Sequence, residues 1–98
     1  MLELDERNYG LAIVQAELPM LIGIYDRGSP RAEGFQPLAE QGSDKIKFCK
    51  LDFHAQPALA DQLCGRGKPS LLLLENGRVI QRLRGNYDCQ ALVEILGL

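Results

Sequence analysis

Short apolar runs separated by polar and glycine-containing segments make up most of this chain. The run MLIGIY, at 20–25, follows a proline, and its length and content are typical of a strand buried on both faces, as in a parallel sheet. The segment KIKFCKLDF, at 45–53, alternates imperfectly between apolar and polar positions. Ile46, Phe48 and Lys50 fall on one side of it, which favours a further strand.

Two apolar runs near the end of the chain are separated by Asn76-Gly77, the strongest short-range signal for an antiparallel hairpin. Together with a short run at the start, the pattern predicts five strands. They are residues 2–4, 20–25, 45–53, 70–74 and 78–83.

Helical spacing and end signals predict four helices between and after these strands. Each begins at a capping side chain or at a proline in its first turn. The signals are Asp5 before apolar positions Tyr9, Ala12, Ile13 and Ala16; Ser29-Pro30 before a helix to about Gln41 with a kink at Pro37; Pro57 and Gly65 around a short helix; and Asp88 before a helix at 89–96.

The order of these elements is β-α-β-α-β-α-β-β-α, which is typical of the α/β class. Strand–helix–strand units joined to a hairpin predict a mixed five-stranded sheet with helices on both faces. The length of 98 residues, with 46% hydrophobic and 24% charged residues, is that of a single globular domain, residues 1–98.

The net charge of −2 argues against nucleic-acid or membrane-surface partners, which need a basic excess. The opening segment MLELDERNYG is acidic and polar where a signal peptide is basic and then apolar, and no apolar run approaches the length of a membrane span. We therefore expect a cytoplasmic protein with neither kind of partner.

Cysteine and histidine are few, and their spacing favours no metal site and no cofactor. Cys49, Cys64 and Cys89 form no Cys-x-x-Cys pair and, with the lone His54, no zinc pattern. We interpret Cys49 as an apolar filler of a strand and Cys64 as buried at a helix end. Cys89, at a helix start, is the one whose thiolate the helix favours.

Three stretches, read after this element order, resemble the thioredoxin family across almost the whole chain. Residues 65–85, GRGKPSLLLLENGRVIQRLRG, resemble the family segment with a cis-proline, an Asn-Gly hairpin and a glycine after the last strand. Residues 18–38 resemble its second strand, active-site loop and kinked helix, and residues 50–63 its third strand and third helix. The resemblance implies a thioredoxin-like fold, a five-stranded sheet flanked by four helices, with Pro69 in the cis form.

The same resemblance places no sulfur at the redox site. Aligned without a gap up to the kink proline, the family's Cys-x-x-Cys falls on Ser29-Pro30-Arg31-Ala32, and its buried acid falls on Gly23. A serine hydroxyl cannot replace a thiolate in disulfide exchange, and we find no general base for it. We therefore expect no catalytic residue and no ordinary disulfide oxidoreductase activity.

What the resemblance leaves is the family's peptide-binding groove, with cations around a helix start that attracts anions. A plainer interpretation is that Ser29 and Pro30 only begin a helix and that the arginines serve solubility. The candidate groove residues are Gly28, Ser29, Pro30, Arg31, Ala32, Lys68 and Pro69, and the candidate anion or partner contacts are Arg27 and Arg66.

Two hypotheses of different classes follow. The first is a non-catalytic protein- or peptide-binding module, chaperone-like or scaffold-like, that is a monomer or a weak homo-oligomer. The alternative is a thiol-disulfide or glutathione-linked redox protein that uses Cys64, Cys89 or Ser29. A subunit of a larger assembly, with the exposed edge of the first strand as a contact, is a third hypothesis.

Overall fold

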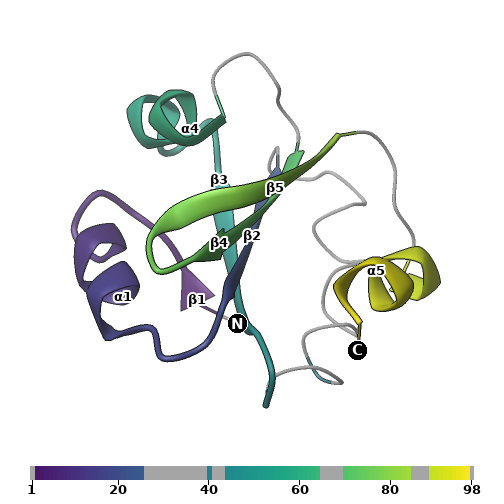
Figure 1. Ribbon diagram of the computed structural model, residues 1–98. Coiled ribbons are helices and arrows are strands. Elements are labelled where there is room, and N and C mark those ends of the chain that lie inside the picture. The colour runs from purple at the N-terminus through teal and green to yellow at the C-terminus, as the bar shows by residue number, and fades with distance from the viewer. Residues whose placement is uncertain (1, 26–39, 41–43, 65–69, 85–88, 98) are drawn as a thin grey trace.

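A five-stranded sheet forms the centre of the computed structural model, which describes residues 2–25, 40, 44–64, 70–84 and 89–97 (Figure 1). The strand order is β1-β3-β2-β4-β5. The strands are β1 (Leu2–Glu3), β2 (Met20–Tyr25), β3 (Lys47–Asp52), β4 (Ser70–Glu75) and β5 (Arg78–Arg84). The described helices are α1 (Tyr9–Gln15), α4 (Pro57–Cys64) and α5 (Cys89–Leu96).

The sheet is mixed, as the sequence predicts. β1 and β2 both run parallel to β3, while β4 is antiparallel to β2 and β5 is antiparallel to β4. β2 lies between two neighbours, and its residue Ile22 pairs with Cys49 on one side and Leu72 on the other. Its first five residues are buried, which confirms the interpretation of 20–25 as a strand covered on both faces.

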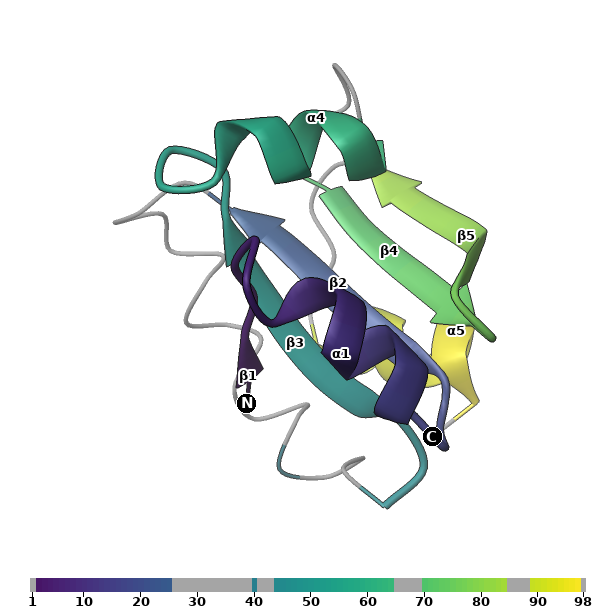
Figure 2. The same cartoon turned by 90° about the vertical axis from the view of Figure 1, so that its left-hand side faces the viewer.

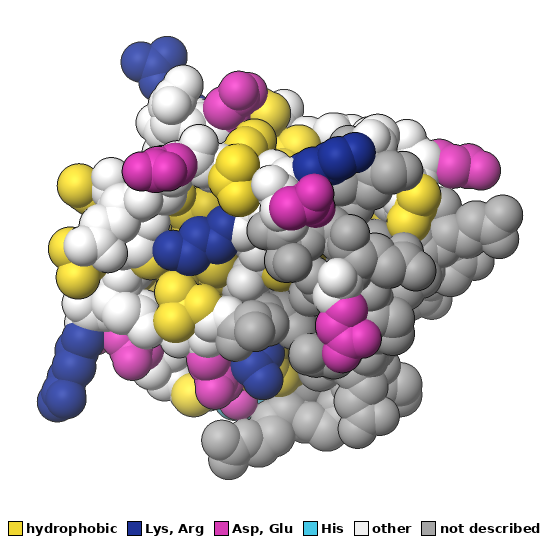
Figure 3. Space-filling view, turned by 90° about the horizontal axis from the view of Figure 1, so that it is seen from below, with side chains coloured by type: hydrophobic (Ala, Val, Ile, Leu, Met, Phe, Trp, Pro, Cys, Tyr) yellow, Lys and Arg dark blue, Asp and Glu magenta, His cyan; other side chains and the backbone are white. Residues whose placement is uncertain are grey.

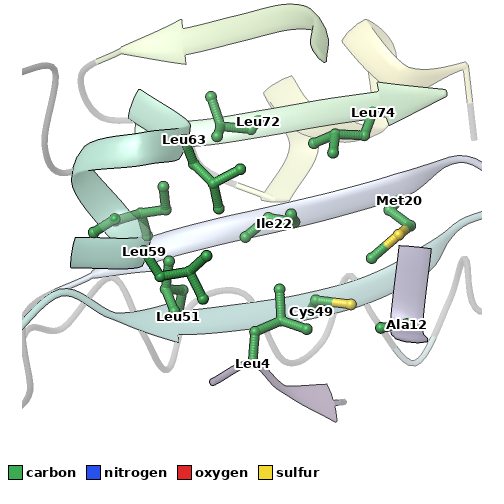
Figure 4. Close-up of a cluster of buried hydrophobic side chains, with 12 residues drawn as sticks. Leu4, Ala12, Met20, Ile22, Cys49, Leu51, Leu59, Leu63, Leu72 and Leu74 are labelled. Carbon is green, nitrogen blue, oxygen red and sulfur yellow. The ribbon is translucent and has the colours of Figure 1, made fainter. Parts of the chain in front are cut away.

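The larger described core lies between the sheet and the helices α1 and α4, which cover one face (Figure 2). Alternate residues of β2, β3 and β4 point into it, since side chains alternate across a strand. Each fully buried leucine stabilises the fold by about 1.5–3 kcal/mol. The buried members, most of them labelled in Figure 4, are Leu4, Ala12, Met20, Ile22, Ile24, Cys49, Leu51, Leu59, Ala60, Leu63, Leu72 and Leu74.

A second cluster occupies the opposite face, on the side of α5. It takes the intervening residues of the same strands, such as Leu21 and Phe48, and packs them against Leu92 of α5. Leu83 of β5 completes this cluster from the far edge of the sheet. Helices therefore cover both faces, as expected for an α/β sheet.

The hairpin between β4 and β5 turns at Asn76 and Gly77, with φ values of 54° and 77°. Two consecutive positive φ values are those of a type I′ turn, which the sequence Asn-Gly predicts. The strand register shifts between Leu73 and Leu74, so that β5 contains a bulge. A Cβ atom on Gly77 would lie 3.1 Å from Cγ2 of Ile13, so the hairpin tip lies against α1.

The start of α1 differs from the prediction that Asp5 caps it directly. Asp5 Oδ1 accepts hydrogen bonds from the backbone N–H groups of Arg7 and Asn8, both at 2.8 Å, and Asn8 Oδ1 accepts one from Asp5 N at 2.9 Å. This reciprocal pair closes a separate turn. The helix then begins at Tyr9, with Asn8 at the N-cap position and no side-chain cap. Its inner face, however, contains the apolar residues that the sequence predicts.

The described residues contain three helices where the sequence predicts four. The difference is the second predicted helix, from Ser29-Pro30 to about Gln41, which falls almost entirely outside the described residues. Pro69, whose peptide bond the resemblance expects to be cis, also lies outside them. α4 begins at Pro57 and α5 spans Cys89–Leu96, both as predicted.

Candidate functional site

The candidate site is the edge of the sheet where β2 ends and β4 begins. Ile24, next to the last residue of β2, pairs with Ser70, the first residue of β4. Tyr25 pairs on its other side with Asp52, the last residue of β3. In open α/β sheets ligands bind beyond the carboxyl ends of parallel strands, and β2 and β3 both end here.

The residues that the sequence analysis assigns to the groove all lie outside the described residues. They belong to the two segments that follow Tyr25 and precede Ser70, so their assignment to a groove stays a prediction. These residues are Arg27, Gly28, Ser29, Pro30, Arg31, Ala32, Arg66, Lys68 and Pro69.

Polar side chains gather on one face of this edge, which the sequence analysis did not identify. Leu51 and Ile24 point into the core under α1 and α4, so their neighbours along the strands point to the opposite face. The Tyr25 hydroxyl donates a hydrogen bond to Glu3 Oε1 at 3.1 Å, a contact that spans from β2 to β1. The set on this face comprises Glu3, Tyr25, Lys50 and Asp52, which we call the polar edge cluster.

Asp52 is the one charged residue among those described as buried, with 3% of its surface exposed. Its Oδ1 accepts hydrogen bonds from the backbone N–H groups of His54 at 2.9 Å and Ala55 at 3.4 Å. Its carbonyl oxygen accepts another from Gln56 N at 2.9 Å. These bonds, two to the buried carboxylate and one to the carbonyl, fix the turn that leads into α4.

His54, the one histidine of the sequence, lies in the turn between β3 and α4. It is exposed, and its ring packs against Phe53 with the ring centroids 4.8 Å apart. Among the described residues, no three His, Cys, Asp or Glu side chains are grouped to hold a metal ion.

Cys49 is the cysteine whose side chain the structure describes, and it is fully buried in the middle of β3. Burial raises the pKa of its thiol from 9.0 to about 11, and the nearby charge of Lys47 lowers it by less. The prediction that Cys49 fills the interior of a strand is confirmed. Cys64 and Cys89 stand at the end of α4 and at the start of α5.

Gly23 occupies the centre of β2, between Lys50 of β3 and Leu71 of β4. The resemblance assigns this position to the family's buried acid. Because Gly23 has no side chain, it places no proton-transfer group in the sheet.

The comparison with known families decides the identity of this fold. A family model described as Thioredoxin matches residues 2–97, nearly the whole chain. The chain belongs to the thioredoxin family. The sheet order, the mixed strand directions and the helices on both faces agree with that assignment.

Membership in the thioredoxin family relates the sheet edge at Ile24 and Ser70 to the family's active site. The family's active-site loop follows the second strand and its proline loop precedes the fourth, as the resemblance indicates, and Ile24 and Ser70 hold those two strand ends together here. No helix within the described ranges is long and apolar enough to cross a membrane.

The polar edge cluster was detectable in principle from alternation along the strands. The pattern of β3 already grouped Lys50 with Ile46 and Phe48, and the next position of that series is Asp52. What the sequence did not provide is the register, which brings Glu3 opposite Lys50 and Tyr25 opposite Asp52.

Proposed function

We propose that this chain is a thioredoxin-family module that binds a protein or peptide partner without exchanging disulfides. The observation that carries the proposal is the placement of sulfur: no two of the cysteines Cys49, Cys64 and Cys89 are separated by two residues. Disulfide exchange needs a thiolate to attack and a second thiol to release the mixed disulfide. Ser29 and Ala32 stand where the resemblance places those two groups.

The chemistry of Cys49 supports the proposal. With a pKa of about 11, its thiolate makes up on the order of 0.01% of the residue at neutral pH. The side chain also lies under α1 and α4, inside the core rather than at the strand edge. It is therefore neither ionised nor accessible to a disulfide.

The pairing of Ile24 with Ser70 supports a groove built from the segment that follows β2 and the segment that precedes β4, because those two strand ends are neighbours. In the proposal Gly28–Ala32 and Lys68-Pro69 form its walls. Arg27, Arg31, Arg66 and Lys68 give it a positive charge in a protein whose net charge is −2. Acidic and unfolded polypeptides are the clients that such a groove favours, in a chaperone-like or scaffold role in the cytoplasm.

The direct test uses a client that has no thiols. Reduced and carboxymethylated α-lactalbumin is permanently unfolded and acidic, and it cannot exchange disulfides. We expect it to bind the wild-type chain in fluorescence anisotropy, and we expect Arg31→Ala/Lys68→Ala to weaken binding by tenfold or more. Arg78→Ala/Arg82→Ala removes two exposed cations from β5 and serves as the matched control. Equal binding by both double variants contradicts the proposed groove.

The redox alternative is tested by insulin reduction driven by dithiothreitol. We expect the rate with this chain to equal the background rate. A faster rate that disappears in Cys64→Ser or Cys89→Ser would show exchange through that thiol, and a rate lost in Ser29→Ala would point to the hydroxyl. Either result contradicts a purely binding role.

A further inference from the structure

α1 has apolar residues on two opposite sides, although the sheet covers only one of them. Its inner side packs Ala12 and Ile13 into the core. On its outer side Leu11 is 60% exposed and Val14 is 82% exposed. A surface helix normally has charged or polar residues there, and a helix that is apolar all round is normally buried.

The composition of α1 makes this unusual for a surface element. Its seven residues, YGLAIVQ, include no charged side chain. Hydrophobic side chains are visible at the surface on the side of the molecule where α1 lies (Figure 3). We call the outer side of α1, with Leu11 and Val14 at its centre, the α1 outer face.

Charges at the two ends of the α1 outer face are arranged to match a second copy in reverse. The end before the helix carries Glu6 and Arg7, and the end after it carries Glu17, with Lys47 close by. In an antiparallel pair whose two-fold axis lies at the level of Ala12, position 7 of one copy faces position 17 of the other. Arg7 then meets Glu17 at both ends of the contact, because a two-fold interface repeats each pair.

A hollow at the second end has room for that arginine. It has a volume of about 290 Å³ and is lined by Gln15, Ala16, Glu17, Leu18 and Lys47. Leu18 offers an apolar wall for the methylene stem of an arginine, and Glu17 offers a carboxylate for its guanidinium.

Gly10 adds an independent observation from within the helix. It is exposed, and a Cβ atom on it would meet nothing within 4 Å, so the packing of the chain itself does not require glycine there. A helical glycine lowers stability relative to alanine, and its absent side chain lets a second backbone approach closely. A partner helix packed closely against α1 would make use of a glycine at this position.

We infer that the α1 outer face is the contact surface of a homodimer, in which two copies pack α1 against α1 in antiparallel orientation. The contact is independent of the proposed client groove, because it uses none of the groove residues. It centres on only two side chains in each copy, Leu11 and Val14. Stable interfaces bury about 1,200–2,000 Å² in total, more than a contact centred on a seven-residue helix provides. The dimer is therefore weak, and its population depends on concentration.

Sedimentation equilibrium of the full chain, over roughly a hundredfold range of concentration up to about 1 mM, tests for this weak association. We expect the average mass to rise toward that of two chains. Val14→Glu is expected to abolish the rise, whereas Ile80→Glu, the matched change at a 54% exposed residue of β5, is expected to leave it intact. A strict monomer over the whole range overturns the inference, as does loss of association in Ile80→Glu alone.

A charge exchange tests the antiparallel geometry and uses residues outside the helix, so that folding is preserved. Arg7→Glu and Glu17→Arg are each expected to weaken dimerisation about tenfold, and the double variant is expected to restore it. Failure of the double variant to recover association overturns the antiparallel pairing. Circular dichroism melts of every variant confirm that the fold is intact.

The α1 outer face could bind a client instead of a second copy of the chain. Repeating the binding assay with carboxymethylated α-lactalbumin distinguishes these two occupants. We expect Val14→Glu to bind this client as the wild-type chain does. If the chain is monomeric and Val14→Glu loses the client, the α1 outer face belongs to client binding and the dimer is refuted. The Arg31→Ala/Lys68→Ala variant keeps the two proposals separate, because we expect it to dimerise normally.

Discussion

The helices α1 and α4 lie on the same face of the sheet. Their buried residues are alike, whereas their exposed residues differ in polarity. Both direct apolar residues into one shared core, with Ala12 from α1 and Leu59 from α4. Outward, α4 exposes Asp61 and Gln62, whereas α1 exposes Leu11 and Val14. The contrast shows that the core fixes the inner residues of a helix and leaves the outer ones to be set by other contacts.

The largest change in the free energy of unfolding is expected in the core that the two helices share. Leu59→Ala removes a side chain that is 4% exposed and leaves a cavity in the shared core, so we expect a loss of about 2–5 kcal/mol in the free energy of unfolding. Urea denaturation measures this loss. Gln62→Ala, on the outer side of the same helix, should change stability by less than about 0.5 kcal/mol. Similar losses in both variants would contradict the division into an inner and an outer side.

The second effect is a loss of stability at high pH, which depends on how completely α1 and α4 exclude water from the thiol of Cys49. A thiol is neutral when protonated, so the raised pKa of Cys49 means that the folded state holds its proton more tightly than the unfolded state. The stability that results is fully present below pH 9.0 and is lost as the pH rises toward about 11. We expect a loss of about 2 kcal/mol across this interval.

Cys49→Ala is the control for that pH dependence. Urea midpoints measured between pH 8 and 11 should fall less steeply in this variant, although its stability at pH 8 is lower because of the cavity. Parallel curves for the variant and the wild-type chain would mean that water reaches the thiol in the folded state.

The third effect tests the contact between α1 and the hairpin. Gly77→Ala forces a side chain into a conformation with φ of 77° and brings its Cβ to 3.1 Å from Ile13 Cγ2. We expect a loss of about 1–2 kcal/mol, measured by thermal or urea unfolding. An unchanged midpoint would show that the turn and α1 shift apart at little cost.

The smallest effect is a gain in stability rather than a loss, and it comes from a substitution on the outer side of α1. Gly10→Ala places a methyl group in open space within a helix, so we expect the monomer to gain about 0.5–1 kcal/mol. Unfolding at micromolar concentration isolates the monomer, while sedimentation at high concentration should show weaker association. A variant that is more stable and dimerises as before would separate Gly10 from the contact.

Local patterns were sufficient to predict the strands and the hairpin, because these depend on residues close in sequence. The run 20–25 and the turn at Asn76-Gly77 were predicted with the correct type and position. The predicted start of the first helix was wrong. Asp5 and Asn8 bond to each other, and the helix begins about one turn later, at Tyr9. Two capping residues three positions apart allow either outcome.

The candidate site was predictable only as a place in the fold. Family resemblance located the strand ends that Ile24 and Ser70 bring together. It did not reveal the hydrogen bond between Tyr25 and Glu3, because these residues are distant in sequence and meet only through the register of both strands with β3. The sequence analysis assigned the core side of this helix to Tyr9, Ala12, Ile13 and Ala16, but it did not show that Leu11 and Val14 are left exposed.

The bulge opposite Leu73 and Leu74 bears on how the free edge of this sheet avoids pairing with other chains. β5 is an edge strand, and a flat edge is a template on which unfolded chains add further strands. The bulge breaks the regular spacing of free backbone groups there, and exposed Arg78 and Arg82 add repulsion between like edges. The bulge and the two arginines thus protect the β5 edge from pairing with a further strand.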